Sequence, residues 1–588
     1  MKKQNTAGKC LTWRSGYETD RRLFFAAVVI LCLAKHWLIW NFPLEVHDSS
    51  IDDRLMVDMA AGILNGQWLG PYDAVKLMKG SAFPVFLAAA NVSGISYLHF
   101  LDLTNTAACL FFTWQIRDLI RDRRLLLVFF TVILFDPSTY SRHAFQRVYR
   151  SSITWSEVLF IFGAYLGLYY KMLARKKTGR WDRGLMGEYL TAAAGAAALA
   201  FFWNTREEGM WILPFALTAS ALIFAIPAGA FRRGETGAAR FLMSAFCLML
   251  FPAAVLSANT AVKMLNRQYY GEAVRLEEND GTFGDALKTI YSVKNRTEIP
   301  YVTVSGEKLE RLCRISPSLA GIRPELDQIL AYYDTIDRGG EDGETEDGWF
   351  FWALHQAAFM AGKTVTLSQS QRFWEQMQEE ILDALEDPAS GLEQQPVMPS
   401  PLMSPFRPAY MQELPRVFVQ AARYMIMYQD TEPLWGPSGK ESPEVCELFR
   451  RVTGNQETVK APQGQLPPQA GWIGRLMSFY RLLNPIAAAA AAVSILLLFI
   501  RSLTDHTREH IPCLLTVCGL LLSAAAVMLG VCYTEISAFA AVNCVYLSGA
   551  YPLMLAGFWT AILYTVRFMY LRKKTGRMFQ KREKHERF

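Results

Sequence analysis

The sequence predicts an all-α polytopic membrane protein, with about ten transmembrane helices and a mainly helical domain outside the membrane. Three observations support this fold class. Apolar residues make up 52% of the 588 residues and charged residues only 19%, whereas a soluble domain carries about 25% charge. The stretch 267–474 holds 19 basic and 31 acidic residues, a net charge of −12, so the rest of the chain carries +18. The basic excess lies in short runs beside apolar stretches, which is typical of cytoplasmic loops.

Ten apolar stretches are expected to cross the membrane as helices, since apolar runs of this kind are what the bilayer core accepts. They are 23–44, 104–116, 125–135, 153–172, 189–203, 211–231, 241–262, 482–500, 511–532 and 546–568. Basic runs close alternate stretches, so the positive-inside rule places both chain ends in the cytoplasm. No small-residue cleavage site follows the first stretch, which is therefore expected to be an uncleaved anchor.

This pattern divides the chain into five expected units. They are a cytoplasmic N-terminus (1–22), a transmembrane core (23–266) with a first outer loop (45–103), an acidic extracytoplasmic domain (267–474), C-terminal transmembrane helices (475–570) and a basic cytoplasmic tail (571–588). An acidic block repels phosphate backbones, which excludes nucleic acid as a partner. A bridge between Cys313 and Cys446 is compatible with a location outside the cytosol, but nothing requires it. The sequence has no Cys/His metal spacing, so a divalent metal is possible but not required.

The first outer loop is the most informative part of the chain. Asp52 and Asp53 follow the first span closely, and 53–65 is predicted to form a helix with its apolar residues on one face. Those residues are Leu55, Met56, Met59, Ala60 and Ile63. A short amphipathic helix beside a span is expected to lie along the membrane surface.

A second apolar segment, 82–101, follows in the same loop, with Lys79 just before it. Three residues interrupt its apolar character: Asn91, Gly94 and Ser96. We place this segment at or in the outer membrane interface.

Asp52 has two interpretations. As the residue before a helix it is a preferred N-cap. Alternatively, it is a general base at the water–lipid boundary, where a carboxylate reaches both a lipid-borne substrate and a soluble one. A neighbouring acid such as Asp53 would raise its pKa toward a useful range.

Several basic residues are placed at outer ends of spans, against the positive-inside bias. Arg147, Arg150 and Arg206 are the candidates for a clamp on a lipid phosphate, because arginine makes bidentate contacts to phosphate oxygens. Lys35, within the first span, is an alternative phosphate contact. Interfacial snorkelling or local ion pairing would explain the same residues without a function.

Two further groups are weaker candidates. Glu207 and Glu208 form a possible second acidic element, or a solvated loop. The aromatic run 349–352 is expected in a core, although such rings also stack on sugars.

The order of these features resembles the opening of the GT-C superfamily, polytopic glycosyltransferases that use polyprenyl-phosphate sugars. It is similar to the dolichyl-phosphate-mannose–protein mannosyltransferase group and the lipid A aminoarabinose transferases. There an acidic pair opens a juxtamembrane helix and a Lys-Pro-Pro-Leu stretch follows. Asp52 matches the first acid, Asp53 the second, and Lys79 the lysine.

This similarity covers about the first 260 residues as topology and the first outer loop as motif. The chain departs from the family pattern at three points. The second acid is Asp53 rather than a glutamate, Lys79 is followed by Gly80, and Arg150 is followed by Ser151 where an acid is common.

The resemblance implies a GT-C-like membrane glycosyltransferase of the cell envelope, in the cytoplasmic membrane of a bacterium. It would move a sugar from a polyprenyl-phosphate-linked donor to a glycan, lipid or protein acceptor at the outer membrane face, by an inverting single displacement. Asp52 would deprotonate the acceptor hydroxyl, Asp53 would orient it, and Lys79 with the arginines would hold the phosphate. The alternatives are a transporter or channel with an outer binding domain, and a cell-surface polysaccharide polymerase or ligase.

Overall fold

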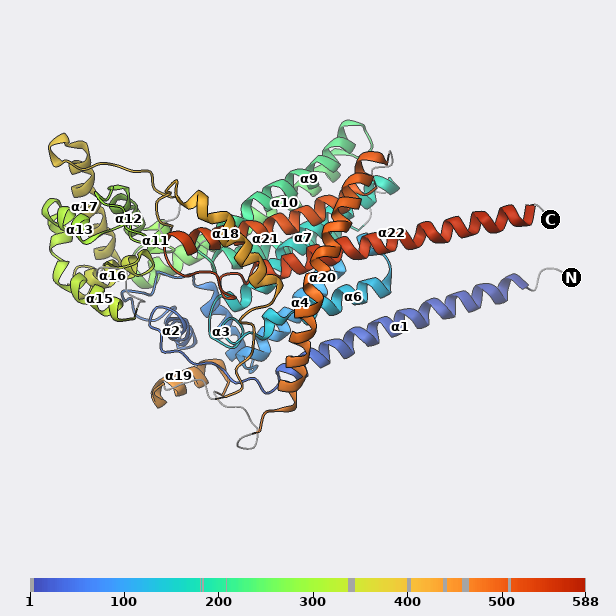
Figure 1. Cartoon of the computed structure of the whole chain (residues 1–588), viewed down its shortest axis with the longest axis horizontal. Coiled ribbons are helices and arrows are strands. Elements are labelled where there is room, and N and C mark those ends of the chain that lie inside the picture. Colours follow the sequence, from blue (N-terminus) through green and yellow to red (C-terminus); the bar gives the residue numbers. More distant parts are fainter. Residues whose placement is uncertain are drawn as a thin grey trace.

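The structure, a computed structural model, describes residues 5–179, 181, 184–207, 209–336, 344–398, 403–436, 441–456, 465–505 and 509–586. Across these residues the chain forms helices joined by loops, and no strand longer than an isolated bridge occurs there. The all-α prediction is therefore confirmed. In Figure 1 the long helices run side by side as a bundle, and a cluster of shorter helices lies at one end of it.

Within the described residues, eight helices are long and apolar enough to cross a membrane. They are α1 (Asn5–Ile39), α7 (Ser151–Thr178), α8 (Leu185–Trp203), α9 (Leu213–Arg232, preceded by the 3-10 turn η2, Gly209–Ile212), α10 (Ala238–Tyr270), α20 (Pro468–Thr504), α21 (Ile511–Ser537) and α22 (Ala550–Glu586). This defines a multi-pass membrane protein.

The remaining two expected crossings differ from these. A ninth span arises only if α3 (Ala82–Val92) and α4 (Tyr97–Gln115) count as one, and these two helices meet at a bend of 108°. The bend falls between Asn91 and Ser96, where the sequence predicts an interruption. The stretch 125–135 belongs to α6 (Arg123–Leu134), which follows the short α5 (Arg117–Ile120). With 12 residues, α6 is about 18 Å long and too short to cross a core of about 30 Å unaided.

The free ends of α1 and α22 lie at the same end of the molecule, and the helices α11 to α17 lie at the opposite end (Figure 1). The basic chain ends and the acidic block are thus separated by the bundle, as the charge distribution predicts. Which of these ends faces the cytoplasm stays a prediction.

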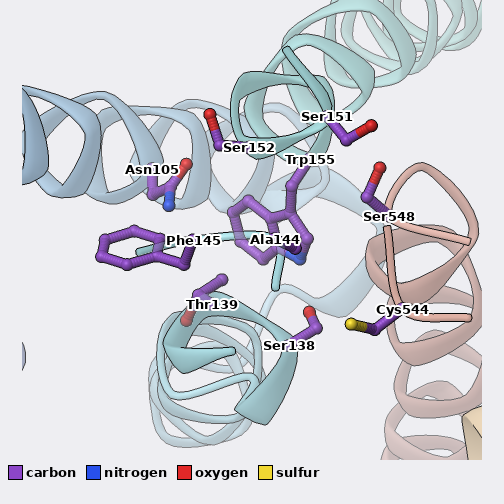
Figure 2. A pocket seen from close by; sticks show the side chains of 10 residues that line it. All are labelled: Asn105, Ser138, Thr139, Ala144, Phe145, Ser151, Ser152, Trp155, Cys544 and Ser548. Atoms are coloured by element: carbon purple, nitrogen blue, oxygen red, sulfur yellow. The ribbon is translucent and has the colours of Figure 1, made fainter. Parts of the chain in front are cut away.

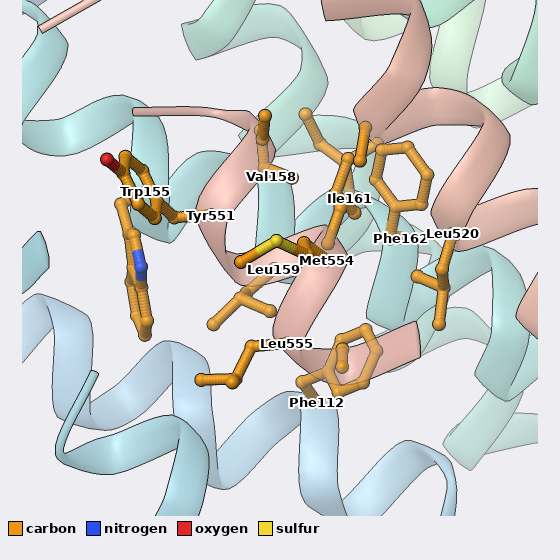
Figure 3. Packing of buried hydrophobic residues seen from close by; sticks show 14 of the residues in the cluster. Phe112, Trp155, Val158, Leu159, Ile161, Phe162, Leu520, Tyr551, Met554 and Leu555 are labelled. Carbon is orange, nitrogen blue, oxygen red and sulfur yellow. The ribbon is translucent and has the colours of Figure 1, made fainter. Parts of the chain in front are cut away.

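The central helix of the bundle is α7. In its most apolar part 72% of the residues are buried, against 17% to 50% in the other candidate spans. Figure 3 shows its side chains Val158, Leu159 and Phe162 packed among residues of α4, α21 and α22. Residues at the first turn of α7, where the chain enters this packed core, are therefore on a well-anchored helix.

Seven helices and a 3-10 turn form the cluster at the far end: α11 (Glu277–Asp280), α12 (Thr282–Ser292), α13 (Gly306–Ile315), α14 (Pro317–Ala320), α15 (Arg323–Ile336), α16 (Asp347–Met360), α17 (Leu367–Glu386) and η3 (Pro388–Ser390). They share a hydrophobic core of their own, to which Phe350, Phe351 and Trp352 belong. The aromatic run is thus part of a core, as expected.

The two later helices of the block 267–474 pack elsewhere. α18 (Tyr410–Ile426) contacts α20 and α21, and its buried residues belong to the core of the bundle. α19 (Pro443–Thr453) contacts α2 and α3. Cys313 and Cys446 are free thiols and pack against different hydrophobic clusters.

The predicted amphipathic helix of the first loop is α2 (Asp53–Leu64). Leu55, Met56, Met59 and Ala60 are buried, and Ile63 packs beside them. This apolar face packs against α3 and α19, and the position of α2 along the membrane surface stays a prediction. α3 follows α2 closely in the chain, whereas α19 comes almost four hundred residues later, and no local pattern indicates its contact with α2.

Candidate functional site

Four chain segments bring the predicted site residues together where the bundle meets the α11–α17 cluster. They are the start of α2, the loop before α3, the loop between the 3-10 turn η1 (Pro137–Tyr140) and α7, and the loop after α8. Each segment follows or precedes a helix that is anchored in the core. The charged side chains at these ends therefore have fixed positions.

Asp52 forms an ion pair with Lys79. The Lys79 side chain is only 5% exposed, whereas that of Asp52 is 28% exposed. Asp52 makes no side-chain hydrogen bond to the amides that begin α2, so its carboxylate does not act as an N-cap. Burial raises the pKa of Asp52, but Lys79 and then Arg147 and Arg150 outweigh burial and hold this pKa below its usual range.

Asp53 forms a two-pronged ion pair with Arg147. Nε of Arg147 donates to Oδ1 of Asp53 at 3.0 Å, and Nη2 donates to Oδ2. The Asp53 side chain is fully buried. Burial raises the pKa of Asp53, and Arg147 opposes that rise. The backbone carbonyl of Arg147 accepts a hydrogen bond of 2.9 Å from the hydroxyl of Tyr97, which fixes this loop on α4.

Glu207 pairs with Arg150 and also accepts a hydrogen bond of 2.9 Å from the backbone amide of Gly80. This carboxylate ties together the start of α7, the end of α8 and the loop that carries Lys79. A Cβ at Gly80 would collide with the backbone carbonyl of Asn204, so this close approach requires glycine. Glu208, the other predicted acid, lies outside the described residues.

Arg206 and Lys35 have other partners. Arg206 donates to Oγ of Ser151 at 2.7 Å, one residue beyond Arg150. Lys35 in α1 donates to Oγ1 of Thr139 at 2.6 Å, and its ammonium lies 3.5 Å from the centre of the Tyr140 ring. The structure thus brings Arg206 to the edge of the charge cluster and leaves Lys35 in a separate environment.

Two aromatic side chains line the same cluster: Tyr149, which the sequence analysis did not select, and Trp352, which belongs to the aromatic run 349–352. The Lys79 ammonium lies 5.7 Å from the centre of the Tyr149 ring and 5.5 Å from that of Trp352. Arg147 lies 5.1 Å from the Tyr149 ring. Tyr149 stands between Arg147 and Arg150 in the sequence, which could have drawn attention to it. Trp352 comes from α16, and no local signal links it to this site.

A small cavity lies at Ser151, the residue to which Arg206 donates, and Figure 2 shows the side chains that line it. Ser151 and Ser152 of α7, Ser138 and Thr139 of η1, and Cys544 and Ser548 are among the residues that line it. Its volume is about 10 Å³, which is room for about one water molecule. The cavity is too small for a substrate.

The described residues contain no group of three or more His, Cys, Asp and Glu side chains that could hold a metal ion. Instead, the carboxylates of Asp52, Asp53 and Glu207 are each paired with a cation. An ionised carboxylate of this kind can accept a proton, and the cations beside it can hold an anionic group. The cluster thus combines a candidate base with candidate anion-binding groups.

The fold and this cluster define an all-helical, multi-pass membrane protein with buried ion pairs at one end of its bundle. No protein-family model and no curated protein sequence matches the chain. Among solved structures, it is similar to ArnT from Cupriavidus metallidurans in the apo state, with 12% identity, a TM-score of 0.29, and coverage of 94% of this chain and 77% of that one. For the same protein bound to undecaprenyl phosphate the identity is 13%, the TM-score 0.26, and the coverage 94% and 78%.

Proposed function

We propose that the chain is a membrane glycosyltransferase that moves a sugar from a polyprenyl-phosphate-linked donor to an acceptor hydroxyl at the outer face of the membrane. One observation carries the proposal: Asp52, partly exposed, is paired with Lys79 beside Arg147 and Arg150. The cluster lies where the loops leave the apolar helices, and we expect a lipid-borne donor and a soluble acceptor to meet at this level of the protein.

In the proposed reaction Asp52 is the general base. The acceptor oxygen attacks the anomeric carbon of the donor sugar while the bond from that carbon to the phosphate oxygen breaks, and the configuration inverts. The acceptor proton passes to Asp52, and the electron pair leaves with the polyprenyl phosphate. Cations near the departing phosphate stabilise its developing charge.

The ion pairs support the following roles for the other residues. Asp53 is fully buried and held by Arg147, so it orients the first loop and Arg147. Lys79 and Arg150 are the phosphate-binding candidates, and each is paired with a carboxylate. A bound phosphate would compete for both cations. Because Lys79 then holds Asp52 less tightly, the pKa of Asp52 would rise when the donor is in place, which makes it a better base.

Sugar transfer by the purified chain in proteoliposomes tests the proposal. The donors are a panel of polyprenyl-phosphate hexoses and pentoses, and donor consumption is followed for the wild type, Asp52→Asn and Asp53→Asn. Loss of a positioned base lowers the rate by about 10²–10⁴-fold, so Asp52→Asn should be nearly inactive while folded. Near-normal turnover by Asp52→Asn would remove the catalytic assignment.

The same assay separates the remaining alternatives. A transporter would move the donor or a solute across the membrane without breaking the sugar–phosphate bond. A polysaccharide polymerase or ligase would use a donor with more than one sugar and give a product of correspondingly higher mass.

A further inference from the structure

An open cleft of about 430 Å³ lies at the far end of α2 from Asp52. It is formed by the loop after α2, the last turn of α10 and the start of α17. Its lining residues come from these three segments, and the ones that matter here are Gln67, Tyr72, Tyr269, Tyr270 and Thr366. The volume falls within the range of small-molecule sites.

The lining has a distinct chemical character. Three of its residues are tyrosines, and the others are glycine, proline, glutamine, threonine, valine and leucine, with no charged side chain among them. The Tyr269 side chain is 44% exposed, so one aromatic ring is available to a ligand. Lys76, which lies close to Gly70, is buried and paired with Asp73 at 3.5 Å. The cleft is therefore suited to a neutral ligand with both apolar and hydroxyl groups.

The cleft wall is held rigidly. Trp68 adopts a φ of 53°, which is rare for a bulky residue, and its indole donates to Oδ1 of Asn266 at 2.7 Å. The hydroxyl of Tyr270 donates to the carbonyl of Gly70 at 2.8 Å, and that of Tyr269 to the carbonyl of Gly66 at 3.3 Å. These bonds fasten the loop after α2 to the end of α10. A preformed wall reduces the entropy cost of binding.

We infer that this cleft binds a neutral carbohydrate, which rests on the proposed function and identifies the acceptor as a glycan. Sugar rings present C–H groups that pack on aromatic faces, and hydroxyls that bond to amide and hydroxyl groups. The lining supplies both kinds of partner and no charge. A phosphorylated ligand would lack a cationic partner among the lining residues.

The loop between α2 and α3 connects the cleft to the charge cluster, because it contributes Tyr72 to the first and Lys79 to the second. The hydroxyl of Tyr72 donates to Oε1 of Glu277 at 2.8 Å, and the chain continues from Tyr72 to Lys79 seven residues later. Glu277 is buried and also accepts a hydrogen bond of 2.5 Å from Ser370 of α17. The loop that carries Lys79 is thus joined to α10 through Tyr270 and, through Glu277, to α17.

Binding is tested without sugar transfer. The full-length chain in detergent micelles is titrated with maltose, lactose, cellobiose and mannobiose, and saturation-transfer NMR and calorimetry are recorded. We expect transfer of saturation from aromatic protons to sugar C–H groups for at least one of these sugars. Tyr269→Ala should weaken that binding by about 3–10-fold, whereas Tyr269→Phe, which keeps the ring, should retain it. Tyr332→Ala, at an exposed tyrosine of α15, is the matched control.

The outcomes separate this inference from the proposed function. Binding that Tyr269→Ala weakens, and that Asp52→Asn leaves unchanged, supports a glycan subsite remote from the chemistry. Absence of saturable binding by all four sugars, or equal binding by Tyr269→Ala and the wild type, overturns the inference. In that case a transfer rate that falls in Asp52→Asn would still support the proposed reaction with another class of acceptor.

Discussion

The carboxylate of Asp52 is paired with the ammonium group of Lys79, 27 residues further along the chain, and not with the backbone amides of the helix that Asp52 precedes. This ion pair couples the two residues electrostatically. The lysine sets the protonation of the acid, and the acid compensates the charge of a buried lysine.

The pairing predicts a shift in the pH dependence of sugar transfer. Lys79 contributes to holding the pKa of Asp52 below its usual range, so the base form persists at low pH. Lys79→Met should move the acidic limb of the kcat/KM profile, which reports the free enzyme, to higher pH by about 1–3 pH units. The limb position is read independently of the absolute rate. Lys263→Met, at an exposed lysine paired with Asp280, is the control, and an unmoved limb in Lys79→Met would contradict the pairing.

Arg147→Ala should destabilise the protein, because it leaves the buried carboxylate of Asp53 without its partner. The expected loss is about 3–5 kcal/mol in the free energy of unfolding, measured by denaturant titration in micelles. Adding Asp53→Asn should restore part of it, since a neutral amide needs no counter-charge. Arg314→Ala, at a side chain that is 77% exposed, should cost about 0.5 kcal/mol or less. Additive losses in the double variant would show that the two residues are independent.

The contact between the first loop and the α11–α17 cluster should weaken in acid. Burial raises the pKa of Glu277, but His355, Ser370 and Tyr72 outweigh burial and hold this pKa below its ordinary value of 4.5. The stabilisation is thus fully present above pH 4.5 and is lost as the pH falls through the lower value of the folded state. Glu277→Gln should cost about 1–3 kcal/mol at neutral pH and should flatten the stability profile below pH 4.5. An unchanged profile would exclude Glu277 as its source.

Cysteine labelling can determine which end of the molecule faces the outside of the cell. We expect the α11–α17 cluster to face outward, because the acidic block and the basic chain ends lie at opposite ends of the bundle. A single cysteine at position 314 of α13, in a cysteine-free background, should react with a membrane-impermeant maleimide in intact cells. Reaction only after permeabilisation would reverse the orientation and with it the outer location of the site.

Most residues of this charge cluster could be selected from the sequence, for stated physical reasons. Asp52 and Asp53 follow the first span closely and match an acidic pair, Arg147 and Arg150 break the positive-inside bias, and Glu207 is a weaker acidic candidate; all five belong to one cluster. The partner of each charge could not be predicted. Arg147 meets Asp53 across 94 residues, and such pairing depends on how helices pack.

In the fold, too, local features could be predicted from the sequence, whereas contacts between distant segments could not. The apolar face of α2 and the break after α3 follow from local patterns, and both agree with the structure. The covering of α2 by α19 does not, because α19 is separated from it by almost four hundred residues. The tyrosine cleft was also missed, since its three walls come from distant segments and its residues carry no charge to attract notice.

Helix α2 has 12 residues and so spans about 18 Å, with the proposed base at one end and the carbohydrate cleft at the other. A rigid helix fixes the distance between the proposed reacting centre and the proposed carbohydrate cleft. An acceptor shorter than this interval would touch only one end at a time, and one that reaches both ends would gain the binding energy of the second contact. Transfer should then rise steeply at a threshold number of sugar units, and the distribution of product lengths would record the length of a single helix.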